Sequence, residues 1–349
     1  MIVVTGGAGF IGSCVVITVV AFRLLLLINR RRGEGMVCFY VHQGNQDYFK
    51  ASITHLKRKI PHIQIIVLAK TEEEIIEGVK SIKVVDSYDG LAKEFAKKYV
   101  HISANKFEYE KFCFERWFYI KEFMEKNNIN DAIYIDSDVL LNNINRDYVN
   151  SQGRFFICSG SGHTSFFSYK QLSCFCDYVL KKYEDRKSVE KLKTLSDYKI
   201  HNGEISGISD MTLITMYALK TGNVGDLAHI SHLSVYDHNV NISDGFEMNG
   251  SQKSIYYYND SYYFKDLSTG IMIKANSLHF QGDAKRFMNT VSDTHLCNKD
   301  VWMIYNYNGE KWVDMKKKIF RGSKQKKVKK MVYKIRKRIE MDRSFKSVH

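Results

Sequence analysis

The chain has 349 residues, 44% of them hydrophobic and 26% charged, and a formal net charge of +14. This balance excludes a disordered or fibrous chain, and the length suffices for one large α/β domain. Seven scattered cysteines, an odd number without zinc-site spacing, exclude a disulfide-stapled scaffold and indicate reduced, mostly buried thiols in a cytosolic protein.

Residues 1–35 differ in character from the rest. Gly7, Gly9 and Gly12 fit G-x-G-x-x-G after a short strand, which resembles the opening of nucleotide-sugar epimerases and dehydratases. No second strand with a ribose-binding acid follows in order. Three interpretations stay open: an atypical or chimeric leader with Met36 as the natural start, a membrane segment over 8–28 with the arginines 30–32 in the cytoplasm, or a working dinucleotide site.

From residue 36, predicted strands and helices alternate. Strands are expected over 37–41, 63–68, 82–85 and 132–135. Helices are expected over 46–59, from the T-x-x-E capping box at 71–74, over 90–99, and over 108–127. Arg116 on the last of these is expected on the exposed face, with neutralisation of phosphate charge as the alternative. This alternation predicts a mostly parallel sheet that binds ligands at the carboxyl ends of its strands.

The second half of the chain is more mixed. Strands are expected over 155–158 and 164–167 around a Gly-Ser segment, and helices over 171–184 and 188–195. Ser209 is expected to cap a helix that reaches residue 219. A hairpin over 255–258 and 262–265 and a last strand over 277–280 complete the body. We expect the first half to hold a nucleotide and the second to shape an acceptor pocket, within one domain over 36–320.

Two motifs indicate the chemistry. Asp136 and Asp138 follow the apolar strand 132–135, and alternate residues of a strand point the same way, so both carboxylates are expected to face one Mg2+ or Mn2+. Downstream, His279, Gly282 and Lys285 form H-x-x-G-x-x-K, which offers an imidazole for the metal, a glycine for close backbone approach and an ammonium for a phosphate. A metal, a diphosphate and a leaving group are the ingredients of sugar transfer from a nucleotide sugar.

With these residues in place, 36 to about 290 resembles the GT-A-type bacterial nucleotide-diphospho-sugar transferases of capsular or exopolysaccharide synthesis. The motif pair is similar to that of the glycogenin and lipooligosaccharide galactosyltransferase group, except that Arg286-Phe287 stands where that pattern has Pro-Trp. The resemblance implies a Rossmann-like, mostly parallel central sheet flanked by helices, with a smaller acceptor-side subregion. It favours transfer with retention.

The motifs and the resemblance assign roles to ten residues. Asp138 is expected to be the main metal ligand, Asp136 a second ligand or a ribose contact, and His279 the third ligand. Lys285 and the backbone at Gly282 are expected to meet the diphosphate. The remaining assignments are Asp210 at the donor sugar or acceptor, Gln43 and Asn45 at the base or ribose, and His163 and His238 at sugar hydroxyls. For Asp210 the alternative is an ordinary first-turn acid favoured by the helix dipole.

The tail, 321–349, is strongly basic. It holds twelve Lys or Arg (321, 324, 326, 327, 329, 330, 334, 336, 337, 338, 343 and 346) against Glu340 and Asp342, and so carries ten of the fourteen net positive charges. Apolar residues recur at helical spacing, which indicates a basic amphipathic helix for an anionic membrane surface. A solvated tail is the alternative, and no nucleic-acid partner is expected because no nucleic-acid module accompanies the charge.

Together these features predict a cytoplasmic glycosyltransferase, peripheral on the inner membrane face, that moves a sugar from a nucleoside diphosphate sugar to a glycan or lipid-linked acceptor. One alternative is an NAD-dependent epimerase or dehydratase, which rests on residues 1–13; Tyr178 and Lys182 match its Tyr-x-x-x-Lys spacing, but nothing around them fits. The other is a non-enzymatic membrane- or polyanion-binding protein with a degenerate transferase fold.

Overall fold

The computed structural model describes residues 36–44, 46–84, 90–145, 153–203, 207–229, 231, 233–295, 297 and 300–315. The predicted leader and basic tail lie outside the described residues. The helices are α2 (Asp47–Lys59), α3 (Leu91–Lys98), α4 (Phe107–Asn127), α6 (Tyr169–Glu184), α7 (Arg186–His201), α8 (Asp210–Thr221) and α9 (Met288–Ser292), with short 3-10 helices η1 (Leu227–His229), η2 (Gly282–Phe287) and η3 (Tyr307–Gly309).

An eight-stranded sheet forms the centre of the molecule, in the order β3-β4-β2-β1-β5-β8-β7-β9. Neighbours from β4 to β5 are parallel, β8 runs antiparallel to β5, and β9 is parallel to β7, so the predicted mostly parallel sheet is confirmed. Its strands are β1 (Val37–Val41), β2 (Gln64–Ala69), β3 (Glu74–Ile76), β4 (Val79–Lys83), β5 (Asp131–Ile135), β7 (Phe155–Cys158), β8 (Ser161–Ser168) and β9 (Val224–Asp226).

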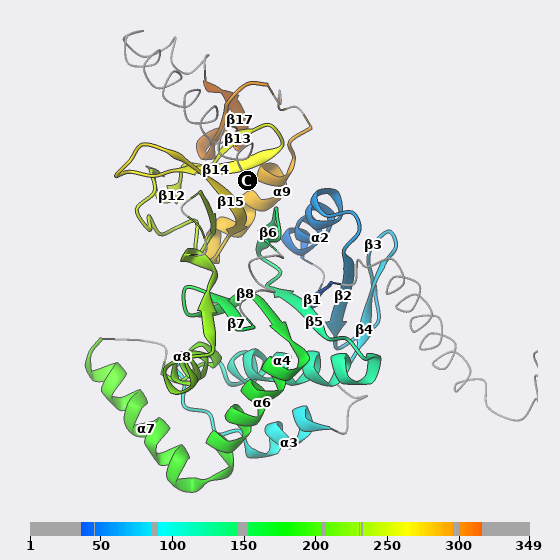
Figure 1. Ribbon diagram of the computed structural model, residues 1–349, viewed down its shortest axis with the longest axis vertical. Helices are drawn as coiled ribbons and strands as arrows, with labels where there is room; N and C mark the ends of the chain where they lie inside the picture. The colour runs from blue at the N-terminus through cyan, green and yellow to red at the C-terminus, as the bar shows by residue number, and fades with distance from the viewer. Residues whose placement is uncertain are drawn as a thin grey trace, which may run out of the picture.

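Apolar strands are buried on both faces of this sheet. In β1, Val37, Phe39 and Val41 pack into one core beside α4, whereas Cys38 and Tyr40 pack into another beside α2. Figure 1 shows α3, α4 and α6 on one side of the sheet and α2 on the other. Burial on both faces explains why the parallel strands read as continuous apolar runs.

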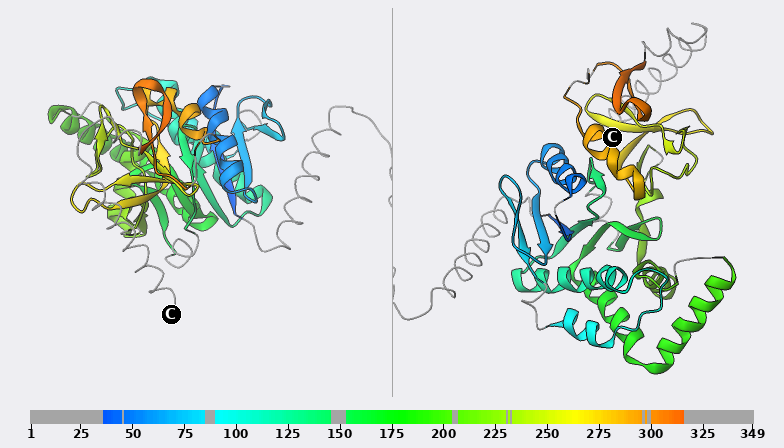
Figure 2. Two further views of the ribbon diagram at one scale, coloured as in Figure 1. Left: turned by 90° about the horizontal axis from the view of Figure 1, so that it is seen from above. Right: turned by 180° about the vertical axis from the view of Figure 1, so that it is seen from behind.

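A second, seven-stranded sheet follows in the order β10-β15-β14-β13-β16-β17, with β6 paired to β15. The predicted hairpin at its centre is confirmed, and its turn residues Asn259 and Asp260 both have positive φ, as a tight hairpin turn requires. Figure 2 shows this sheet beyond α2 and α9, opposite the layer of α3, α4 and α6. The strands are β6 (Val139–Leu141), β10 (Ser234–Tyr236), β13 (Tyr256–Tyr258), β14 (Ser261–Lys265), β15 (Met272–His279), β16 (Met303–Asn306) and β17 (Lys311–Asp314), and β11 (Met248–Asn249) and β12 (Gln252–Lys253) form a separate pair.

The structure corrects three expectations about local structure. The capping box at 71–74 opens no helix, because the Glu73 amide donates to the Ser81 hydroxyl and the chain forms the hairpin β3–β4, which buries Ile75 and Val79. Residues 277–280 are not the last strand, since β16 and β17 follow and add to the second sheet. The helix expected over 188–195 is the longer α7.

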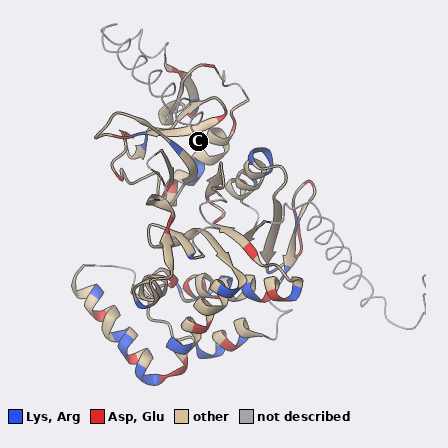
Figure 3. Cartoon of the chain, in the orientation of Figure 1, with Lys and Arg blue, Asp and Glu red and all other residues tan. Residues whose placement is uncertain are grey.

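Charged side chains lie mainly along the helices. Figure 3 shows Lys and Arg interspersed with Asp and Glu along α3, α4, α6 and α7, whereas the central strands are mostly uncharged. Within the described ranges, no helix combines the length and the apolar character that crossing a bilayer demands.

Candidate active site

Strand pairing brings the two sequence motifs together. The short strand β6 begins directly after Asp138, and it pairs antiparallel with the end of β15, with Val139 opposite His279. The Phe280 amide also donates a 2.9 Å hydrogen bond to the Asp138 carbonyl. This pairing joins segments from the middle and the late part of the chain at the carboxyl end of β5, where parallel sheets place their ligands.

Three of the predicted site residues, Asp138, His279 and Lys285, are in contact and form what we call the Asp138 group. His279 Nε2 lies 3.5 Å from one carboxylate oxygen of Asp138, and Lys285 Nζ lies 3.1 Å from the other. Lys285 Nζ also lies 5.0 Å from the centre of the Tyr48 ring on α2. The Asp138 carboxylate is buried, whereas Lys285 is about one-third exposed, so the ammonium is the member of the group that reaches solvent.

The charges of the Asp138 group support one another. Burial opposes ionisation of Asp138, but the hydrogen bond from His279 and the Lys285 ammonium outweigh it and hold the pKa of the carboxyl below its ordinary value. Burial likewise disfavours the charged forms of His279 and Lys285, and Asp138 overcomes this and raises the pKa of both. Asp138 is therefore an ionised carboxylate at neutral pH.

The donor atoms of Asp138 and His279 fit a divalent cation. His279 Nδ1 donates to the His238 carbonyl, so in the neutral imidazole the Nε2 lone pair faces the Asp138 carboxylate. A lone pair and an anion facing each other at 3.5 Å need a proton or a cation between them. Two ligands about 2.1 Å from one Mg2+ or Mn2+ lie about 3 Å apart at a right angle, close to the observed separation.

Asp136 turns to a different set of side chains, which we call the Asp136 group. Arg116 donates from Nη1 to Asp136 at 2.8 Å and to the Tyr134 hydroxyl at 2.9 Å, and from Nη2 to Asp210 at 2.5 Å. Tyr134 donates to Asp136, and Trp117 Nε1 donates to Asp210 at 3.0 Å. One guanidinium thus links a predicted metal ligand to the predicted catalytic Asp210.

Arg116 is buried, and the expectation that it lies on an exposed helix face is wrong. It lies near the middle of α4, where the sheet, α3, α6 and α8 leave every residue from 114 to 124 buried. A helix packed on several sides has no single apolar stripe, so the amphipathic pattern misassigned this arginine. Its buried charge is instead compensated by Asp136 and Asp210.

The predicted three-ligand metal set is not assembled in the structure. The strand β5 ends at Ile135, and residues 136–138 form a turn into β6, so the alternation that would align the two carboxylates does not apply. Among the described residues, no three or more His, Cys, Asp or Glu side chains are grouped so as to hold a metal ion. Asp138 and His279 are the two predicted ligands that come together, and the role of Asp136 as a ligand stays a prediction.

Asp210 is the first residue of α8, and the expected cap is confirmed: the Ser209 hydroxyl accepts from the Thr212 amide. The Asp210 carboxylate is buried, and its second oxygen accepts from the Met211 amide. Both sequence interpretations remain compatible with this position, because Asp210 is a first-turn acid that also reaches the site through Arg116.

The other predicted residues lie around these two groups. Gln43 lines a cavity of about 130 Å³ at the carboxyl ends of β1 and β2, and Asn45 lies outside the described residues. His163 lies on β8 and stacks on His279 with ring centres 4.0 Å apart, and His238 lies beside them. Gly282, whose φ of 61° favours glycine, borders an open cavity of about 670 Å³ whose lining includes the amide side chains of Asn241, Gln252 and Gln281.

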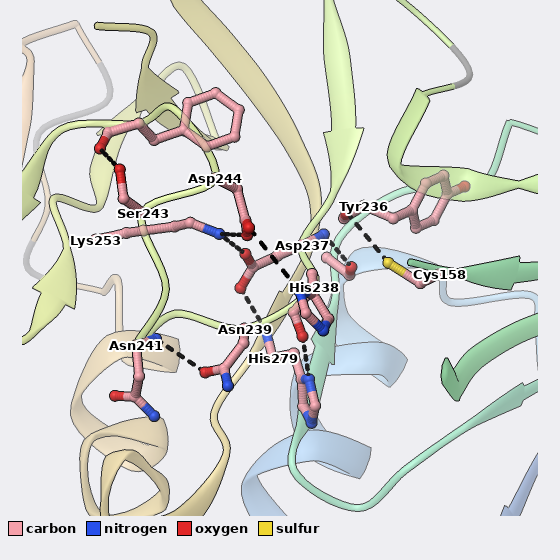
Figure 4. Close-up of polar contacts among 12 residues, drawn as sticks. Cys158, Tyr236, Asp237, His238, Asn239, Asn241, Ser243, Asp244, Lys253 and His279 are labelled. Carbon is pink, nitrogen blue, oxygen red and sulfur yellow. Dashed lines mark hydrogen bonds and ion pairs between the residues drawn. The ribbon is translucent and has the colours of Figure 1, made fainter. Parts of the chain in front are cut away.

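One buried cluster escaped the sequence reasoning. Lys253 is 1% exposed and ion-pairs with Asp237 at 2.6 Å and with Asp244 at 2.7 Å (Figure 4). Asp237 also accepts from the His279 amide at 3.0 Å. The cluster of polar residues at 236–239 drew attention to this loop, but nothing in the sequence indicated that Lys253 on β12 would be buried beneath it.

No family model and no curated protein matches this chain. Similar solved structures include the galactosyltransferase LgtC in complex with donor and acceptor sugar analogs, at a TM-score of 0.42 and 12% identity over 72% of this chain and 89% of that chain. A glycosyltransferase involved in glycosylation of the major capsid of PBCV-1 has a TM-score of 0.37 and 9% identity over 74% and 98%. Mouse xyloside xylosyltransferase 1 has a TM-score of 0.37 and 12% identity over 55% and 84%. These likenesses concern the fold alone.

Proposed function

We propose that this protein is a metal-dependent glycosyltransferase that moves a sugar from a nucleoside diphosphate sugar to a glycan or lipid-linked acceptor. The observation that carries the proposal is the convergence of Asp138, His279 and Lys285 at the carboxyl end of the central sheet. An oxygen donor, a nitrogen donor and a partly exposed ammonium at one point suit a cation-bound diphosphate.

Each residue of the Asp138 group has a task in this proposal. Asp138 and His279 would hold a Mn2+ or Mg2+ ion, which when bound neutralises the diphosphate of the departing nucleotide. Lys285 would leave Asp138 for a phosphate oxygen and add its charge at the place where negative charge develops. Arg116 ion-pairs with both Asp136 and Asp210 and so fixes the two carboxylates in place beside that point. The motif resemblance favours retention of the anomeric configuration.

Two cavities offer places for the two substrates. The smaller one at Gln43, His42 and Lys70 lies at the strand ends where the base and ribose of the donor would bind. The larger one beside Gly282 and Gln281 continues from the H-x-x-G-x-x-K segment, and its amide side chains suit the hydroxyls of an acceptor glycan. His238, whose side chain is about one-third exposed, would contact the sugar hydroxyls, whereas His163 is buried against the His279 ring.

We further propose that the enzyme acts in cell-surface polysaccharide synthesis, as a cytoplasmic protein held on the inner membrane face by its basic tail. The support comes from the sequence: the excess of Lys and Arg over 321–349, interleaved with apolar residues. Vesicles with and without anionic lipid, mixed with the full chain, test this part, and equal binding to both contradicts it.

A screen of nucleotide sugars in the presence of Mn2+ tests the activity. The protein's own donor should raise the midpoint of thermal unfolding in a Mn2+-dependent way, and slow hydrolysis of that donor should accompany binding. The Asp138→Asn variant should lose both effects. Metal binding and transfer that survive in Asp138→Ala would defeat the assignment.

A further inference from the structure

The imidazole of His279 is held from three directions. Its Nδ1 donates to the His238 carbonyl, its backbone amide donates to the Asp237 carboxylate, and the ring of His163 covers one face at 4.0 Å with 15° between the planes. His163 Nε2 in turn lies 3.1 Å from the Asp237 carbonyl. The carbonyls of two successive residues, 237 and 238, therefore each accept from one of two stacked histidines.

His163 carries an unfavourable feature that an apolar residue in its place would avoid. The ring is 1% exposed, and its Nδ1 has no hydrogen-bond partner among the described residues. Leaving such an atom buried and unpaired destabilises the folded state. A carbonyl oxygen can only accept, so the 3.1 Å contact with the Asp237 carbonyl places a proton on His163 Nε2. The flat face and the Nε2 proton are therefore what this position gains from histidine.

The segment that receives these bonds is itself anchored. Lys253 lies between Asp237 and Asp244, and the Asp237 amide donates to the Ser277 hydroxyl on β15 at 3.1 Å. Figure 4 shows the Lys253 ammonium joined to both carboxylates and the His279 ring below the His238 backbone. With the loop fixed to β12 and β15, the carbonyls at 237 and 238 have one position relative to both histidines.

We propose that His163 is a positioning residue: stacked on His279 and bonded to the anchored loop, it fixes the His279 imidazole in the tautomer and orientation that turn Nε2 to Asp138. This inference rests on the proposed function for its purpose, since an oriented imidazole serves a cation shared with Asp138. His163 acts through His279 and is not itself placed at the cation, because the nitrogens of two parallel rings at this spacing do not converge on one point.

The experiment compares two variants of similar volume in the full chain. His163→Leu removes both the flat ring and the N–H donor, whereas His163→Phe keeps the ring and loses the donor. His62→Ala, which removes an exposed histidine, is the control. The first measurement is NMR of the histidine ring nitrogens in 15N-labelled, metal-free protein at alkaline pH, where His279 is neutral. The His279 signals are assigned by their absence in His279→Gln. Wild type should show the tautomer protonated at Nδ1, His163→Phe should keep it, and His163→Leu should show exchange between both tautomers.

The second measurement is binding of Mn2+ alone, without substrate, followed by electron paramagnetic resonance of the free ion. His163→Leu should weaken binding by roughly tenfold, as loss of an orienting partner does, and His163→Phe by less. An unchanged tautomer and unchanged Mn2+ affinity in folded His163→Leu overturn the inference, as does a loss in His163→Phe equal to that in His163→Leu. If the wild-type protein binds no Mn2+ but the tautomer of His279 depends on His163, the positioning role stands and the metal part of the proposed function fails.

Discussion

The two carboxylates of the D-x-D motif are two residues apart, and each pairs with a cation from a different layer of the molecule. Asp138 faces the imidazole and ammonium of the second sheet, with Lys285 about one-third exposed beside it. Asp136 faces Arg116 from the helical layer, which also holds the buried Asp210. In the first setting a partly exposed ammonium can leave Asp138 for a ligand. In the second, one buried guanidinium is shared by two carboxylates, so it is held from both sides and the three groups together keep one formal negative charge.

This difference has consequences for both function and stability. Replacement of an acid with an open, exchangeable partner should damage binding and catalysis more than folding. Replacement of a residue in a closed ion-pair network should damage folding first, because the remaining charges stay buried without compensation. Stability and activity measured on the same variants therefore separate the Asp138 group from the Asp136 group.

The largest effect is expected for Asp138→Asn. The change keeps the shape of the side chain but removes the charge that would hold the cation, so transfer should fall roughly a thousandfold. The matched variant Asp136→Asn, with Arg116 still paired to Asp210, should lose only about tenfold. Steady-state transfer rates with Mn2+ in excess make this comparison, and a larger loss in Asp136→Asn would reverse the roles assigned to the two acids.

The next effect concerns Arg116→Met, which leaves the Asp136 and Asp210 carboxylates without their shared partner. The free energy of unfolding should fall by about 3–5 kcal/mol, the usual range for breaking a buried ion pair from one side. Urea unfolding of wild type and variant measures this change.

A second substitution tests whether the stability lost in Arg116→Met comes from the carboxylates left without a partner. In the double variant Arg116→Met with Asp210→Asn, one of the two orphaned charges is gone, so part of the lost stability should return. Asp210→Asn alone also tests the predicted role of Asp210: a loss of transfer much larger than the loss of stability would indicate contact with substrate. Additive losses in the double variant would contradict the ion-pair network.

The sequence predicted most of the first sheet because its strands are apolar on both faces and its helices carry clear boundaries. It also indicated the chemistry of the Asp138 group, because the D-x-D and H-x-x-G-x-x-K motifs consist of side chains that bind metal ions and phosphates. It did not reveal that Asp136 and Asp138 would separate, because the alternation argument assumed that the strand continues beyond Ile135. Arg116 and Lys253 were missed for a related reason. A buried charge is defined by partners from other segments, and no local pattern reports them.

A smaller effect is expected for Lys285→Gln. The charge that would meet the diphosphate disappears, and because a hydrogen bond to a charged group contributes about 1.5–3 kcal/mol, KM for the nucleotide sugar should rise about 10- to 100-fold. The free energy of unfolding should fall by less than in Arg116→Met, since Lys285 is about one-third exposed and His279 still faces the buried Asp138 carboxylate. Lys285→Arg should restore part of the affinity. A large drop in stability with an unchanged KM would place Lys285 in the structural class of Arg116.

The last prediction concerns the hydrogen bond that joins α2 to the end of β6, the strand that follows Asp138. His55 on α2 donates from Nε2 to the Asn142 side chain at 2.6 Å, just after β6, and its Nδ1 accepts from Arg58 at 3.1 Å. Both nitrogens are satisfied only in the neutral ring. Burial lowers the pKa of His55 from 6.5 to about 3, although the bond to Asn142 opposes the shift.

Because the unfolded chain takes up this proton below pH 6.5 and the folded chain does not until about pH 3, His55 destabilises the folded state progressively as pH falls through that window. The slope from this one group should approach about 1.4 kcal/mol per pH unit. Urea unfolding across the window should give a flatter dependence for His55→Gln than for wild type, with the difference largest at the acid end. Parallel curves would mean that His55 is protonated in the folded protein, and the contact between α2 and the end of β6 would then need a different hydrogen-bonding scheme.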